Sequence, residues 1–151
     1  MKEIINTISK FLAIIESNCS NEEAINNLML SLDELALVSH SVTYEFDVAE
    51  HPDAPNLDAL ELRKKVCKRF PSLGYYNIVA DIGEKFCESE IHVGDAIDDV
   101  TEIAQALSAV IWYSDNTSIS NALYHFQFGF RCHWGRHLRE LQLYLYDQVW
   151  G

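Results

Sequence analysis

Two histidines near the C-terminus have a spacing that could bind a metal ion. His133 and His137 lie four residues apart in a segment with helical periodicity, so both side chains project from one face of a helix. Asp98, Asp99 and Glu102 lie in the first turns of the preceding helix and offer oxygen ligands if the two helices pack antiparallel. One hypothesis is therefore a site for a divalent metal such as Zn or Mn, in a metal-binding bundle or a metal-dependent hydrolase.

The same residues allow a structural interpretation, in which the two histidines pack beside Trp134 and form hydrogen bonds with the acids of the preceding helix. The metalloprotease pattern H-E-x-x-H is absent because Trp134 follows His133, so the motif carries no general base. The sequence also contains no Ser-His-Asp elbow, phosphate-binding loop or glycine-rich dinucleotide turn. No catalytic residue is assigned, and an enzyme is the less favoured alternative.

Composition and charge narrow the choice of partner. The chain has 151 residues, of which 48% are hydrophobic and 23% charged, so it is long and apolar enough to form a core. Its formal net charge is −12, which disfavours nucleic acids and anionic membranes because both are bound through positive charge. A basic protein is the partner that this charge favours.

The sequence carries no signal for export or membrane insertion. The N-terminus has no continuous apolar stretch of the signal-peptide kind, and no apolar run reaches the length of a membrane span. The four cysteines are widely spaced, without a C-x-x-C pair, which is typical of reduced thiols. We expect a cytoplasmic protein.

Every strongly periodic segment has the period of an α-helix. The helices predicted from this pattern cover 2–17, 20–40, 57–70, 93–111 and a last segment from Ser118 or Ser120 through Leu145. Tyr75–Val79 has strand propensity but no evident partner strand, so we expect a short helix or an ordered connection there. The prediction is an all-α fold, one domain over 1–151, built as a bundle of about six helices.

The core of this bundle should contain one apolar stripe from each long helix. The positions expected to be buried are Ile8, Leu12, Leu28, Leu32, Val100, Leu107, Phe126, Phe130, Trp134 and Leu141. Gly129 and Gly135 flank Trp134, and a glycine within a helix needs a packing or functional reason. Both a binding pocket at Trp134 and close packing of its ring are consistent with this pattern.

Five of the eleven basic residues lie between Arg63 and Arg69. This cluster could bind a phosphate group, or it could be a solvated helix face near the end where the helix dipole favours cations. The sequence does not decide between these roles.

The longest loop, from Tyr44 to Asn56, is the strongest candidate for a partner site, because long loops often carry function. It combines aromatic residues with acids, and Tyr75 and Tyr76 could form the opposite wall of one groove. The leading hypothesis is a non-catalytic interaction protein without a cofactor, such as an immunity or regulatory partner of a basic macromolecule. Its expected binding residues are Tyr44, Glu45, Phe46, Asp47, Glu50, Tyr75, Tyr76 and Trp134.

Three segments resemble a bacterial family of unknown function, DUF5063. They are Arg69-Phe70-Pro71-Ser72-Leu73-Gly74-Tyr75-Tyr76, Val93-Gly94-Asp95-Ala96-Ile97-Asp98-Asp99-Val100, and Phe128-Gly129-Phe130-Arg131-Cys132-His133-Trp134-Gly135-Arg136-His137-Leu138. The likeness covers nearly the whole chain, and the His-Trp-Gly-x-His run is its most specific part. The resemblance implies an all-helical cytoplasmic bacterial domain and adds no catalytic residue.

Overall fold

The computed structural model describes residues 1–83 and 87–151, and most of them are helical, as predicted. The elements in chain order are α1 (Lys2–Ile15), α2 (Asn21–His40), α3 (Ala59–Arg69), β1 (Tyr75–Val79), β2 (Ile91–Asp95), α4 (Ala96–Asn116), α5 (Ile119–Gly129), the π-helical segment η1 (Phe130–Trp134) and α6 (Gly135–Trp150). Because α5, η1 and α6 are contiguous, they form one helical run. The described residues therefore contain five helical runs, not six, and a small sheet.

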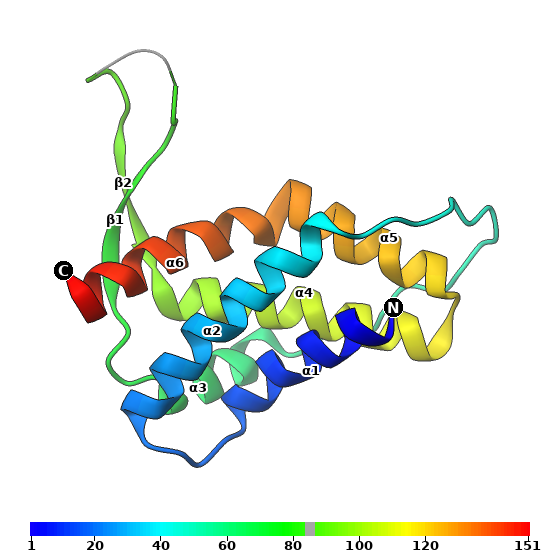
Figure 1. Cartoon of the computed structure of the whole chain (residues 1–151), viewed down its shortest axis with the longest axis horizontal. Coiled ribbons are helices and arrows are strands. Elements are labelled where there is room, and N and C mark those ends of the chain that lie inside the picture. The colour runs from blue at the N-terminus through cyan, green and yellow to red at the C-terminus, as the bar shows by residue number, and fades with distance from the viewer. Residues whose placement is uncertain (84–86) are drawn as a thin grey trace.

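The central element of the bundle is α4, which contacts α1, α3, α5 and α6. Helices α1 and α2 form an antiparallel pair in front of it, and α6 runs along the other side of α2 (Figure 1). The β-hairpin projects from the bundle beside α6, at the end opposite the long loop between α2 and α3 (Figure 1). Among the described residues, no helix is long and apolar enough to cross a membrane.

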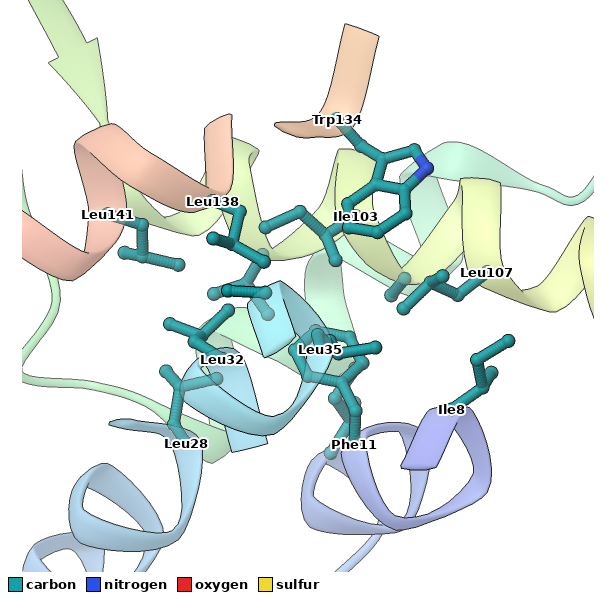
Figure 2. Close-up of a cluster of buried hydrophobic side chains, with 14 of the residues drawn as sticks. Ile8, Phe11, Leu28, Leu32, Leu35, Ile103, Leu107, Trp134, Leu138 and Leu141 are labelled. Carbon is teal, nitrogen blue, oxygen red and sulfur yellow. The ribbon is translucent and has the colours of Figure 1, made fainter. Parts of the chain in front are cut away.

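The core lies where α1, α2, α4 and α6 meet, and Figure 2 shows Trp134 pointing into it from above Ile103 and Leu107. Eight of the ten positions predicted to be buried are so, and the exceptions, Leu12 and Phe130, are partly buried and pack against the core. The helical stripes thus predicted the core correctly.

Side-chain caps set the starts of several helices. Ser20 accepts a hydrogen bond from the Glu23 amide at 3.2 Å and so caps the start of α2. Ser118, one of the two expected caps, begins the last helical run. The third helix was predicted to begin at residue 57, but it begins at Ala59 because Asp58 accepts the hydrogen bonds that start α3.

The short sheet corrects the interpretation of Tyr75–Val79. This segment is strand β1, and it pairs antiparallel with β2 so that Tyr76 lies opposite Gly94. The helix predicted over 93–111 therefore begins too early, because residues 93–95 belong to the partner strand β2. Asp95 ends the strand, and its side chain accepts hydrogen bonds from the amides of Ile97 and Asp98, so α4 begins only after it.

The two glycines beside Trp134 are explained by close packing. A Cβ atom at Gly129 would lie 2.8 Å from Trp134 Nε1, and one at Gly135 would lie 2.0 Å from the carbonyl oxygen of Phe130. Trp134 itself is fully buried. The structure therefore favours the packing interpretation of these glycines.

We predict that Gly135→Ala lowers the free energy of unfolding by about 2 kcal/mol, because overpacking against a backbone atom forces the helix to shift. Gly74→Ala is the matched control, since a Cβ atom there would meet nothing within 4 Å. It should change stability by less than about 0.5 kcal/mol. Urea unfolding of both variants measures the difference, and equal effects would contradict the packing explanation.

Candidate functional site

A buried carboxylate joins three elements at the base of the hairpin. Asp99 on α4 is only 5% exposed. Its Oδ2 accepts a hydrogen bond from the Tyr76 hydroxyl at 2.6 Å, and its Oδ1 lies 2.7 Å from Nδ1 of His137. Asp99 therefore connects β1, α4 and α6.

The pKa values of both partners of Asp99, His137 and Tyr76, are raised in the folded protein. The hydrogen bond to Asp99 raises the pKa of His137 above its ordinary 6.5, and the charges of Asp99, Glu102 and Glu140 act in the same direction, against the effect of burial. Burial and the same carboxylate raise the pKa of Tyr76, so its hydroxyl stays protonated and donates. With Nδ1 held by Asp99, Nε2 is the His137 nitrogen that is left to act on another group.

The structure brings four of the five residues of the expected metal site into pairwise contact and engages the fifth, Asp98, elsewhere. His133 and His137 are neighbours, with ring centres 5.2 Å apart, and Nε2 of His133 lies 3.4 Å from Glu102 Oε2. Asp98, however, bonds Arg63 at 3.1 Å, and Asp99 bonds Nδ1 of His137.

Across residues 1–83 and 87–151, no three His, Cys, Asp or Glu side chains form a group that could hold a metal ion. Metal binding stays a prediction, which elemental analysis of the purified protein and of its His137→Ala variant tests.

Further contacts hold the hairpin against α6. The ring of Tyr76 stacks on Tyr144 with centres 4.7 Å apart, and a Cβ atom at Gly94 would come within 2.7 Å of the same Tyr76 ring. Arg136 Nη2 donates to the carbonyl oxygens of Val79 at 2.8 Å and of Ala80 at 3.1 Å. The stacking on Tyr144 and the hydrogen bond to Asp99 give Tyr76 a structural role, whereas the sequence predicted that it binds a partner.

The loop over residues 41–58 is fixed at several points. Asp47 accepts hydrogen bonds from the Ser118 hydroxyl and, at 3.0 Å, from the Ala49 amide, and it lies 2.8 Å from Nε2 of His51. These bonds, that of Ser118 above all, lower the pKa of Asp47 to about 2. The role of Asp47 is thus to position the loop, a role that the sequence analysis missed.

The positioned loop exposes apolar and acidic side chains together. Phe46 is 76% exposed and Val48 is 88% exposed. Glu45 and Glu50 are also exposed, whereas Tyr44 is partly buried and packs edge-on against Tyr124 at 5.7 Å. Phe46, Glu45 and Glu50 therefore remain available to a partner, and Tyr44 belongs to the core edge.

The expected groove between this loop and the two tyrosines of β1 does not exist. The loop meets α4 near its end, where Tyr113 accepts a hydrogen bond from the Ala54 amide at 3.2 Å. Tyr76 meets the same helix at Asp99, and fourteen helical residues span about 21 Å. Tyr75 is exposed on the hairpin at that far end, and Trp134 lies in the core, so neither can share a surface with the loop.

The basic cluster on α3 is largely used inside the fold. Arg63 donates to Asp95 at 2.6 Å, and Arg69 donates to the carbonyl oxygens of Cys19 and Ser20, both at 2.9 Å. Lys65 bonds Glu16 at 2.6 Å. The cluster thus connects α3 to the start of α4 and to the turn between α1 and α2.

Sequence reasoning also missed an apolar groove between α2 and α6. Its lining includes Leu30, Leu143, Tyr146 and Trp150, all of them more than half exposed. The intervals of three and four residues between Leu143, Tyr146 and Trp150 were the available signal, because they place these side chains along one edge of a helix.

Comparison with known proteins gives a family and a fold. Residues 1–147 match the model of a family described as "Domain of unknown function (DUF5063)". The crystal structure of protein BF1032 from Bacteroides fragilis superposes with a TM-score of 0.79 at 14% sequence identity, covering 99% of this chain and 92% of that chain. No curated protein matches the chain. At this identity the likeness to the solved structure shows the fold alone.

We predict that the His137–Asp99 pair stabilises the fold more in acid than in base. Because the pKa of His137 is raised in the folded state, its contribution is complete below the unfolded value near 6.5 and is lost as the pH rises through the folded value. The loss of unfolding free energy in His137→Gln should therefore be larger at about pH 5.5 than at about pH 9.

Urea unfolding at the two pH values measures this difference, and NMR titration of His137 in Asp99→Asn should show its pKa falling. His92→Gln, at an exposed histidine of β2, is the control and should change the free energy of unfolding by less than about 0.5 kcal/mol. A loss that grows with pH would contradict the assigned direction.

Proposed function

This chain belongs to the DUF5063 family, and from its surface we propose that it is a non-catalytic interaction protein that binds a basic segment of a partner protein. An immunity or regulatory role is the kind of activity that such binding serves. The observation that carries the proposal is the fixed, acidic loop over residues 41–58. No step of the proposal needs a cofactor or a catalytic group.

The loop supports binding because it is ordered before the partner arrives. Asp47 and the contact between Ala54 and Tyr113 connect it to α4 and to the start of α5. A loop that is already fixed loses less conformational entropy on binding than a free one. Its exposed Phe46 offers an aromatic contact of the kind that enriches protein interfaces.

Charge favours a basic partner at this loop. Glu45, Glu50 and Asp53 are exposed, and none of them has an ion pair within the described part of the chain. The net charge of −12 extends the same attraction over a longer distance. Acidic groups around an exposed aromatic side chain raise the association rate with a basic segment and select against acidic ones.

We predict that changing Glu45, Glu50 and Asp53 together to Ser weakens partner binding about tenfold and reduces its salt dependence. The stability of the fold should stay nearly constant, because exposed unpaired charges contribute little. Asp47 is left intact, since its loss would release the loop. The partner is first isolated by quantitative co-purification from the native host and then titrated as a purified protein at several salt concentrations.

The matched control changes Glu3, Glu22 and Glu90 to Ser, because these acids are exposed elsewhere and their removal alters the net charge equally. The control should retain most of the affinity. Equal weakening by both triple variants would show a general effect of net charge and would remove the loop from the interface. Phe46→Ala should weaken binding without changing its salt dependence.

A further inference from the structure

The groove between α2 and α6 is an exposed apolar surface that the proposed loop site does not explain. It encloses about 630 Å³. The full lining is Asn26, Met29, Leu30, Asp33, Arg139, Gln142, Leu143, Tyr146 and Trp150. The Tyr146 and Trp150 rings lie 5.3 Å apart within it. Large aromatic side chains left in water are a frequent mark of an interface.

The exposed side chains have the spacing of a helix-packing seam. Leu143, Tyr146 and Trp150 follow one another at intervals of three and four residues along α6. On α2, Leu30 and the likewise exposed Leu37 are seven residues apart. Such heptad intervals place apolar side chains along one edge of each helix, where a further helix packs against them.

The two helices present this face as one rigid surface. Gln142 on α6 donates to Asp33 on α2 at 2.7 Å, and Arg139 lies 3.2 Å from His40 near the end of α2. Buried leucines from both helices, among them Leu28, Leu32 and Leu141, belong to the common core that Figure 2 shows. The face is therefore formed in the isolated chain and needs no rearrangement to bind.

Charge distinguishes this face from the loop. The groove lining contains one acid, Asp33, and one base, Arg139, so it is locally neutral on a chain with a net charge of −12. A strongly basic segment gains little here in comparison with the acidic loop. If the same face of a second copy packs here, both surfaces are apolar and carry one charge of each sign. A two-fold contact can then place the acid of one copy near the base of the other.

We propose that a second copy of this chain covers the groove, so that the α2 and α6 faces of two copies pack together about a two-fold axis. Two adjacent helices are about 20 Å wide, and the 16 residues of α6 span about 24 Å. The area of this face is roughly 500 Å² per copy when the relief of the side chains is neglected. This area is that of the smaller specific interfaces. The dimer should therefore have a dissociation constant in the micromolar range, on the order of 10 µM.

Sedimentation velocity from about 1 to about 300 µM tests the proposal, and the expected result is a shift from monomer to dimer over this range. The fluorescence emission of Trp150 should shift to shorter wavelengths over the same concentration range. This emission is recorded in a Trp112→Phe variant. Leu143→Ser and Trp150→Ala should each weaken the dimer more than tenfold. Leu60→Ser is the matched control, because Leu60 on α3 is 63% exposed and Leu143 is 66% exposed.

A wild-type protein that stays monomeric at the highest concentration would overturn the proposal. A dimer that survives both groove variants, or that Leu60→Ser weakens equally, would overturn its placement on this face. Both groove positions are exposed, so each variant should fold. Circular dichroism and urea unfolding check this. None of these outcomes bears on the acidic loop, whose test measures a different partner.

Discussion

The arrangement of the hairpin depends on one buried carboxylate. Asp99 lies on the central helix α4 at 5% exposure, and a carboxylate in such a place is costly unless hydrogen bonds compensate for the lost water. Its partners come from elements that are distant in sequence: the Tyr76 hydroxyl from β1 and the His137 ring from α6. Removing either partner leaves the carboxylate partly unsatisfied, so contact between the strand and both helices at this point stabilises the fold.

The same constraint explains why a hairpin of two short strands persists here. An isolated two-stranded hairpin is marginally stable in water. In this chain Tyr76 is held by Asp99 and by stacking on Tyr144, while Arg136 binds the carbonyl oxygens at the end of β1. These contacts hold the strand against α6, and the contacts of Tyr76 serve the fold.

Sequence periodicity was sufficient for the helices and their buried stripes because those features depend on neighbours three and four residues away. It failed where contacts connect distant positions. β2 was assigned to a helix because its pairing with β1 is invisible locally, and Asp47 was placed among surface acids because its bond to Ser118 crosses 71 residues. The predicted groove between Tyr75 and the loop failed for the same reason. The length of α4 keeps the two apart, and the local sequence does not show this.

The distribution of charge gives the molecule two kinds of surface. Three basic side chains hold α3 to its neighbours: Arg63 bonds Asp95, Lys65 bonds Glu16, and Arg69 bonds backbone carbonyl oxygens. Much of the positive charge is therefore used within the fold. Within the described part of the chain, Glu45 and Glu50 of the loop have no such counterion, so they add unbalanced negative charge at that end of the bundle. Between α2 and α6, by contrast, Asp33 and Arg139 balance each other around exposed aromatic rings. Long-range attraction therefore guides a basic partner to the loop, whereas the groove favours a neutral, apolar contact that acts only at short range.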